Sequence, residues 1–178
     1  MKVLIVIDMQ HDFVDGVLGT PEARAIIPAV AAKVAEYVAM DDGVILYTRD
    51  THFDDYMETM EGKYLPVPHC IVNTDGWQIV PEVYTADSET IDKYTFGRHD
   101  LGEKVRSACA AKYNKFDIES IELCGVCTSI CVISNALILK SVFTDIPLIV
   151  DSKCCACVSK ESHEAALTAM KMCQIEVI

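Results

Sequence analysis

The sequence predicts an α/β fold of three layers, in which a mostly parallel, doubly wound sheet of six strands lies between layers of helices. Short apolar runs rich in Val and Ile alternate with longer segments of helical periodicity along all 178 residues. Such alternation is typical of a parallel sheet that is buried on both faces. Apolar residues make up 51% of the chain, and no linker divides it. We therefore predict a single domain over residues 1–178.

Most of the expected strands are short apolar runs, and the expected helices repeat apolar residues at helical spacing. The first helix has the clearest start, since Thr20 is a good N-cap and Pro21 fits the first helical turn. The expected strands span residues 3–7, 44–47, 89–93, 118–124, 146–150 and 175–178. The expected helices span residues 21–37, 100–112, 128–139 and 159–172.

Residues with reactive side chains gather where the expected strands end. Asp8, Asp50 and Lys93 each lie at or just beyond the end of a strand, as does the segment 124–131. In open parallel sheets, binding sites form beyond the carboxyl ends of the strands. The long segment 48–92 lacks periodicity, and irregular segments of this length in compact domains usually have a function. We expect the active site at this edge of the sheet.

The segment from Cys124 to Cys131 has the strongest chemical signal. The strand ends near Cys124, Gly125 permits a tight turn, and Thr128 can cap the helix that carries Cys131 in its first turn. The positive end of the helix dipole would favour the reactive thiolate. The free N–H groups of a helix start could also stabilise an oxyanion. Cys131 is therefore the predicted nucleophile, whereas Cys124 is expected to be a small core residue.

The charge and the composition exclude several classes of protein. A net charge of −12 without a basic run argues against nucleic-acid binding, which needs clustered Lys and Arg. The opening residues do not resemble a secretory signal, and no apolar run is long enough to cross a membrane. The nine cysteines lie in strand-like or helical patterns, as reduced thiols do. These features predict a cytoplasmic protein without a membrane or nucleic-acid partner.

Metal-ligand residue types concentrate in the irregular segment. They are Asp50, His52, Glu61 and His69. Two imidazoles and two carboxylates suit a borderline divalent ion such as zinc, manganese or iron. The alternative is that both histidines only donate hydrogen bonds to the backbone of the loop.

The motifs resemble those of the isochorismatase-like cysteine hydrolases, the superfamily that includes nicotinamidases. Residues 125–132 match the Gly-Val-x-Thr-x-x-Cys-Val nucleophile motif. Residues 8–13 match the opening Asp-x-Gln-Asn-Asp-Phe pattern, with His11 in place of Asn, and residues 16–23 are also similar to nicotinamidases. Lys93 stands at the position of the catalytic lysine. The resemblance extends over residues 1–178.

The resemblance implies roles for the catalytic residues. Cys131 would attack the amide carbon, and Asp8 would take its proton and deliver it to the leaving ammonia. Lys93 would hold Asp8 ionised and help keep Cys131 as a thiolate, as an adjacent cation should. A cis peptide before Cys127 would direct the backbone amides of Cys127 and Cys131 into an oxyanion hole.

The resemblance also implies a metal site and an aromatic pocket. Asp50, His52 and His69 match the metal positions of nicotinamidases, and Glu61 is preferred to Glu58 as a further ligand. In nicotinamidases two aromatic side chains enclose the pyridine ring. Here Phe13 supplies the first, while Leu65 stands near the place of the second, so that Tyr64 or Trp77 would have to complete the pocket.

The implied activity is hydrolysis of a small-molecule amide, with nicotinamide to nicotinate as the leading reaction and NAD salvage as its context. Isochorismate hydrolysis does not need this cysteine, so the presence of Cys131 disfavours that reaction. Hydrolysis of a ureido or carbamoyl amide stays open. A rival from another class is a non-enzymatic Cys-rich metal-binding protein that uses Cys124, Cys127, Cys131 and the cysteines of residues 154–157, although this spacing is weak evidence for such a site. Relatives of this kind also imply a homo-oligomer.

Overall fold

The fold contains one six-stranded sheet with the order β3-β2-β1-β4-β5-β6, and all of its neighbouring strands run parallel. The computed structural model describes residues 1–113 and 117–178. The strands are β1 (Lys2–Ile7), β2 (Gly43–Asp50), β3 (Glu89–Lys93), β4 (Ser120–Val126), β5 (Leu148–Ala156) and β6 (Glu176–Val177). Strand order reverses at β1, between β2 and β4. The predicted three-layer α/β class is confirmed, with a sheet that is wholly parallel.

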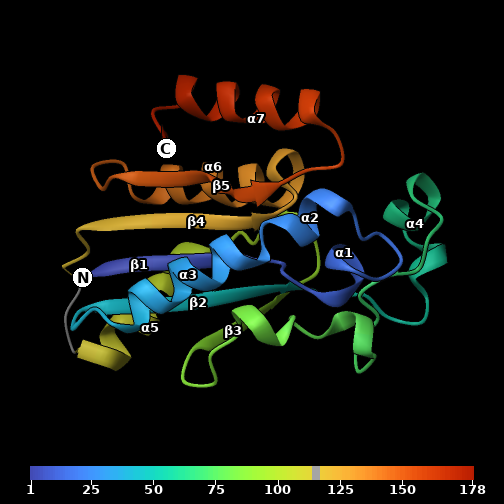
Figure 1. The fold of residues 1–178 in the computed structure, drawn as a ribbon, viewed down its shortest axis with the longest axis horizontal. Helices are drawn as coiled ribbons and strands as arrows, with labels where there is room; N and C mark the ends of the chain where they lie inside the picture. The colour runs from blue at the N-terminus through green and yellow to red at the C-terminus, as the bar shows by residue number, and fades with distance from the viewer. Residues whose placement is uncertain (114–116) are drawn as a thin grey trace.

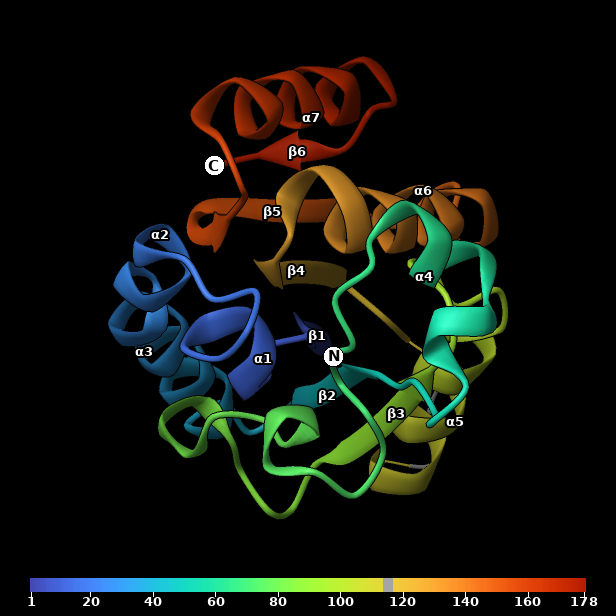
Figure 2. The ribbon, with the colours of Figure 1, turned by 90° about the vertical axis from the view of Figure 1, so that its right-hand side faces the viewer.

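Helices cover both faces of the sheet (Figures 1 and 2). The α-helices are α1 (His11–Val14), α2 (Pro21–Ala25), α3 (Ile27–Val38), α4 (Met60–Tyr64), α5 (Leu101–Tyr113), α6 (Ile133–Val142) and α7 (Lys160–Met172). α3 lies on one face with α1 and α2, α5 and α6 lie on the other, and α7 packs beside β5 and β6 (Figure 2). β1 is therefore enclosed, and the side chains of Val3–Ile7 are fully buried.

The segment between β2 and β3 has little regular structure. It holds α4 and three short 3₁₀ turns, at Tyr56–Glu58, Asp75–Trp77 and Pro81–Val83. Figure 2 looks onto the carboxyl ends of the strands and shows this segment and α1 arranged around them. The irregular segment expected from the sequence thus lies over the edge of the sheet where reactive side chains were predicted.

Several element bounds shift from the sequence prediction, and three of the differences are structural. The helix expected over 21–37 is divided at Ile26, because Pro28 restarts the chain as the first turn of α3. The helix expected from Thr128 begins with a π-helical turn, Thr128–Val132, before α6. The strand expected to end at Val150 continues to Ala156, and its pairing with β4 shifts register between Leu123 and Gly125.

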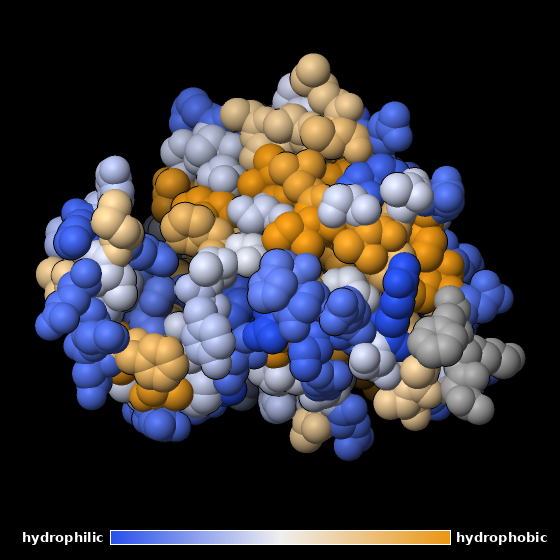
Figure 3. Space-filling model, turned by 180° about the vertical axis from the view of Figure 1, so that it is seen from behind, coloured by the Kyte–Doolittle hydropathy of each residue, from blue (hydrophilic) through white to orange (hydrophobic). Residues whose placement is uncertain are grey.

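Apolar side chains are also exposed on one face of the molecule. Figure 3 shows them on the side covered by α5 and α6, where α6 contributes the exposed side chains of Leu137 and Val142. Among the helices described, none has the length and apolar character needed to cross a membrane.

Candidate active site

The ends of β1, β2, β3 and β4 bring four reactive side chains to one buried point. Lys93 Nζ lies 2.7 Å from Asp8 Oδ2 and 2.9 Å from Asp50 Oδ1. The same ammonium group donates to Cys131 Sγ at 3.6 Å and to the carbonyl of Thr95 at 3.2 Å. The structure therefore brings the three predicted catalytic residues together, with Lys93 at the centre.

Asp8 is held by its backbone and by a neighbouring strand. Its φ of 49° lies in the left-handed region, which non-glycine residues rarely adopt and which is often found at functional sites. Its backbone N–H donates to the carbonyl of Thr48 at 3.2 Å. The Thr48 hydroxyl donates to Asp8 Oδ1 at 2.7 Å, so Oδ2 faces Lys93. The carboxylate is thus fixed in one orientation in the core.

The protonation states follow from burial and from these contacts. Burial alone would lower the pKa of Lys93, but the charges of Asp8, Cys131 and Asp50 raise it well above its ordinary value. Burial raises the pKa of Asp8 and outweighs the opposing charge of Lys93, and Asp50 raises it further. Lys93 is accordingly a permanent cation, while Asp8 is a more basic carboxylate than usual.

The state of Cys131 differs from the sequence prediction. Burial raises its pKa well above the ordinary value, Lys93 lowers it, and the charges of Asp8 and Asp50 raise it again. The predicted resting thiolate is therefore corrected to a neutral thiol, because desolvation at this depth outweighs the cation. A neutral thiol needs a base beside it, and Asp8 occupies that position.

The turn that presents Cys131 requires a glycine. Gly125 has a φ of 116°, and a Cβ at this position would meet the backbone carbonyl of Ile7 on the neighbouring strand. The next peptide, Val126–Cys127, is cis, as the resemblance implies. The π-helical turn Thr128–Val132 then places Cys131 against the ends of β1 and β3.

The four predicted metal ligands form one cluster. One donor atom from each of Asp50, His52, Glu61 and His69 can be chosen so that all four lie within 4.8 Å of one another. His52 Nε2 lies 3.0 Å from Asp50 Oδ2 and 3.6 Å from Glu61 Oε1. His69 Nε2 lies 3.6 Å and 3.8 Å from the same two oxygens.

The chemistry of this cluster fits a divalent ion. His69 Nδ1 lies 2.8 Å from the carbonyl of Val67, which leaves Nε2 free to be a ligand, as is usual for metal-bound histidines. His52 Nε2 is buried and has no hydrogen-bond partner of good geometry among the described residues. The alternative that both histidines serve only the backbone does not account for two Nε2 atoms facing two carboxylates. Asp50 uses its other oxygen for Lys93, which in turn contacts Cys131. Lys93 thus links the cluster to the predicted nucleophile.

Two residues of the opening motif act by positioning others. Gln10 accepts from the backbone N–H of Asp50 at 2.7 Å and donates to the carbonyls of Asp50 and Trp77 at 2.8 Å and 2.9 Å. Asp12 accepts from the N–H of Cys70 at 2.7 Å, next to His69. Both residues stand in the matched opening motif, but their backbone partners are distant in the sequence, so these contacts could not be predicted from it. His11, which replaces Asn and begins α1, has its Nδ1 atom 3.0 Å from Oδ1 of Asp15, the residue just beyond that helix.

A cavity of about 250 Å³ opens onto Cys131. Of the predicted substrate-binding residues, Phe13 and Leu65 line it. Phe13 lies beside His69, with 5.3 Å between the ring centroids. The second aromatic residue of the lining is Phe96, which the sequence analysis missed because it follows β3 and is not part of a matched motif. The lining comprises Phe13, Leu18, Asp50, Glu61, Leu65, His69, Phe96, Cys127, Ile130, Cys131 and Val158.

The structure corrects the expectation for Trp77. Its side chain is buried away from the cavity, where Nε1 donates to the Thr51 hydroxyl at 2.8 Å. The guanidinium of Arg49 stacks over the ring at 3.3 Å from its centroid. Both contacts of Trp77 are therefore structural, since the indole holds the loop that follows β2 in place.

The remaining cysteines do not form a metal site. Cys124, Cys154 and Cys155 are buried within strands, and the potential metal cluster found in residues 1–113 and 117–178 includes no cysteine. Cys124 is separated from Cys131 by the turn after β4. The Cys-rich metal protein is therefore not supported by the geometry.

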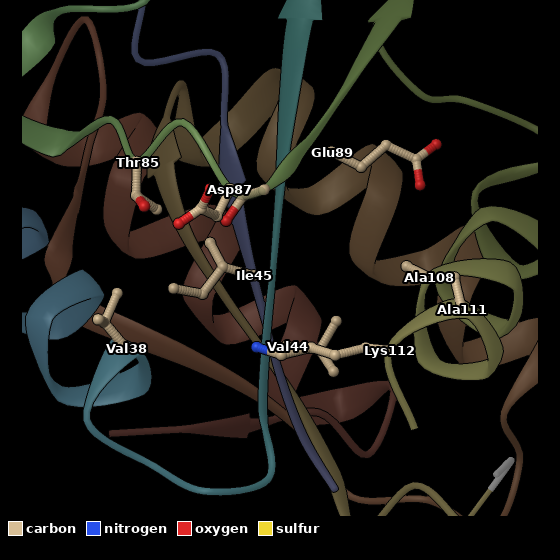
Figure 4. Close-up of a pocket in the computed structure, with 10 residues that line it drawn as sticks. Val38, Val44, Ile45, Thr85, Asp87, Glu89, Ala108, Ala111 and Lys112 are labelled. Carbon is tan, nitrogen blue, oxygen red and sulfur yellow. The ribbon is translucent and has the colours of Figure 1, made fainter. Parts of the chain in front are cut away.

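A second hollow lies at the opposite end of β2, with a volume of about 570 Å³. Figure 4 shows Val44 and Ile45 of β2 between Val38 of α3 and the alanines of α5. Its lining combines Asp87, Glu89 and Lys112 with small and apolar residues, and it lacks a buried nucleophile with an adjacent base. The carboxyl ends of the strands therefore remain the candidate active site.

Comparison with known proteins agrees with this arrangement. The family model described as isochorismatase domain matches residues 2–178. A nicotinamidase/pyrazinamidase of Mycobacterium tuberculosis is 26% identical over 190 residues and covers 100% of this chain and 98% of its own. Among solved structures, a pyrazinamidase of Pyrococcus horikoshii in complex with zinc is 26% identical, with a TM-score of 0.81, covering 99% of this chain and 98% of its own. A pyrazinamidase/nicotinamidase from Streptococcus mutans is 25% identical, with a TM-score of 0.82 and complete coverage of both chains.

Proposed function

The chain belongs to the isochorismatase family and is an amidohydrolase that acts on carbon–nitrogen bonds, and we propose that it releases ammonia from a small amide with Cys131 as nucleophile. Nicotinamide, converted to nicotinate, is the leading substrate. The observation that carries the proposal is the buried ammonium of Lys93, which contacts Asp8, Asp50 and Cys131 at once. The similarity to nicotinamidase/pyrazinamidase relatives supports the choice of substrate.

The first half of the reaction forms an acyl-enzyme. Asp8, whose pKa is raised by burial, takes the proton of the Cys131 thiol, and the sulfur attacks the amide carbon. The developing oxyanion accepts hydrogen bonds from the backbone amides of Cys127 and Cys131, both of which line the cavity. Asp8 then gives its proton to the nitrogen, which leaves as ammonia, and a thioester of Cys131 remains.

The second half restores the enzyme. Asp8, again ionised, takes a proton from a water molecule that attacks the thioester carbon. The carbon–sulfur bond breaks, and the proton returns to Cys131. The overall reaction consumes one amide and one water and yields one carboxylic acid and one ammonia. Lys93 stays charged throughout and limits the cost of the negative charge that moves between Asp8 and Cys131.

The metal cluster has a supporting part in this proposal. Asp50, His52, Glu61 and His69 would hold one divalent ion, for which zinc, manganese and iron are the candidates. When bound, such an ion supplies a Lewis-acidic contact for a lone pair of the substrate. The expected metal ligand Glu61 and the apolar side chains of Phe13 and Leu65 line the same cavity. These residues would hold the pyridine ring of nicotinamide while Cys131 faces the amide group.

An ammonia-release assay tests the proposal. The purified protein is offered nicotinamide, pyrazinamide, simple amides and ureido acids, which also separates an amidase from a carbamoyl hydrolase. Cys131→Ala should abolish release, whereas Cys173→Ala, at an exposed thiol, should leave it unchanged. Release by the Cys131→Ala variant at the wild-type rate would exclude the mechanism.

A further inference from the structure

An apolar groove lies beside the nucleophile cavity. Its volume is about 650 Å³, and its walls come from α4, from the loop after β3 and from the turn after β4. The apolar and aromatic side chains that line it are Met60, Tyr64, Leu65, Tyr94, Phe96 and Ile130. Most of them are exposed. An exposed group of large apolar side chains next to an active site indicates a binding surface.

The groove is continuous with the cavity that contains Cys131. Glu61, Leu65, Phe96 and Ile130 line both spaces. The two spaces therefore adjoin along these four side chains. A molecule held over the Cys131 thiol has the groove as its neighbouring space on this side.

The groove borders the metal cluster and not the catalytic base. His52 and Glu61 line the groove, whereas Asp8 is fully buried at the inner end of the site. Under the proposed mechanism, the amide nitrogen leaves beside Asp8. The part of a substrate that enters the groove must then belong to the acyl side of the amide.

The lining also restricts the charge of its occupant. The described residues that line the groove include no Lys or Arg, and its only carboxylate is Glu61. Burial of an anion without a cationic partner is costly. The groove therefore suits a neutral, apolar group.

Hydrogen bonds fix one wall of the groove relative to the nucleophile. The buried Asn135 side chain donates to the carbonyl of Phe96 at 3.0 Å and to that of Cys131 at 2.8 Å. It also accepts from the N–H of Arg98 at 2.9 Å. Beyond Phe96, the ring of Tyr94 stacks on Phe53 with 5.9 Å between centroids. A preformed wall lowers the entropic cost of ordering a ligand.

We propose that the substrate is a primary carboxamide whose acyl part carries a neutral apolar substituent, and that this substituent lies in the groove between α4 and the loop after β3. The inference rests on the proposed amidase function and narrows its substrate class. Met60 and Tyr94, which line the groove but not the cavity, are the residues that select the substituent.

The test compares nicotinamides that carry methyl, ethyl or propyl at ring positions 5 or 6 with the parent and with 5-carboxynicotinamide. Ammonia release gives kcat/KM for the wild type, and calorimetric titration of Cys131→Ala gives Kd without turnover. At one ring position, each added methylene should improve both constants by up to about fourfold, the equivalent of about 0.8 kcal/mol for a fully buried methylene. The carboxylate should weaken binding.

Substitutions in the groove locate the effect. A Met60→Ser, Tyr94→Ser double variant should reduce the gain from propyl over the parent to less than about twofold. Both side chains are mainly exposed, at 65% and 59%, so the variant should fold. Met172→Ser, at a methionine on α7 that is more exposed than Met60, is the control and should keep the full gain.

The results separate the inference from the function on which it rests. Turnover of nicotinamide with no gain from any alkyl group at either position overturns the inference and leaves the amidase function standing. A preference for the carboxylate also overturns it. If the double variant instead dissociates a dimer in sedimentation and no alkyl gain is seen, a second copy of the chain covers the groove. If no amide is bound or hydrolysed, the proposed function fails and the inference with it.

Discussion

Lys93→Met should destabilise the protein as well as inactivate it. The substitution keeps the length and the apolar stem of the side chain but removes the only cation that contacts Asp8 within the described residues. Asp50 retains His52 as a partner at 3.0 Å. The fully buried carboxylate of Asp8 retains two neutral partners, the Thr48 hydroxyl and the Cys131 thiol, and no cation among the described residues.

The loss of stability depends on whether Asp8, without Lys93, stays charged or takes up a proton. Leaving one charge of a buried pair uncompensated costs about 3–5 kcal/mol. Asp8 limits this cost by taking a proton. For a carboxyl with an ordinary pKa of 3.8, that proton costs about 4 kcal/mol at pH 7 and about 1.6 kcal/mol at pH 5, since one pH unit corresponds to about 1.36 kcal/mol. The loss of stability should therefore be about 3–4 kcal/mol at pH 7 and less than about 2 kcal/mol at pH 5.

The stability deficit of Lys93→Met depends on pH through the Asp8 carboxyl. Burial already raises the pKa of Asp8, and the charge of Lys93 lowers it. In the variant only the raising effects remain, so the folded state binds the Asp8 proton more tightly than the unfolded state. Such a group stabilises the folded state below its unfolded pKa, and this contribution is lost as pH rises through the folded pKa. The deficit relative to wild type must grow with pH.

Urea unfolding in the presence of a chelator measures this deficit. The fluorescence of Trp77, the single and buried tryptophan, reports the transition. Lys171→Met, at an exposed lysine of α7, controls for the loss of a positive charge as such. Wild-type stability of Lys93→Met at pH 7, or a deficit that grows toward pH 5, would refute the reasoning.

Three further predictions concern single side chains. Asp8→Asn keeps the shape of the side chain but removes the base, so kcat should fall at least ~100-fold in the ammonia assay. Glu61→Gln should weaken metal retention on dialysis, measured by elemental analysis, while Glu58→Gln, at an exposed position outside the cluster, should not; equal retention by both variants would remove Glu61 from the site. Gly125→Ala should lower stability by more than about 1 kcal/mol in urea unfolding, because the new Cβ meets the carbonyl of Ile7 at a φ of 116°, and an unaffected midpoint would contradict this.

The sequence predicted the strands and the clustering of the candidate catalytic residues because both leave local signals. The apolar run before Asp8 could only be a buried strand, and the spacing from Gly125 to Cys131 describes a turn followed by a helix. Motifs of this kind name the residues at each strand end. The strand order then brings Asp8, Lys93 and Cys131 to one point without further information.

The substrate cavity and the state of the nucleophile could not be predicted in the same way. Phe96 and Ile130 meet there from different elements, and nothing in their local sequence distinguishes them from other apolar residues. Trp77 was expected at the substrate because the pocket lacked a second aromatic side chain, but Arg49 and Thr51 hold it elsewhere. The pKa of Cys131 depends on burial, which is a property of the folded molecule and not of the motif.

The central claim is that Cys131 forms a covalent acyl intermediate. Acid quenching of the wild type during turnover of nicotinamide, followed by mass spectrometry of its peptides, tests the claim directly. We predict an acyl group on the Cys131 peptide, which should be absent from Cys131→Ala and should disappear when the substrate is exhausted. Steady ammonia release without any acylated Cys131 peptide, together with turnover by Cys131→Ala, would contradict the mechanism.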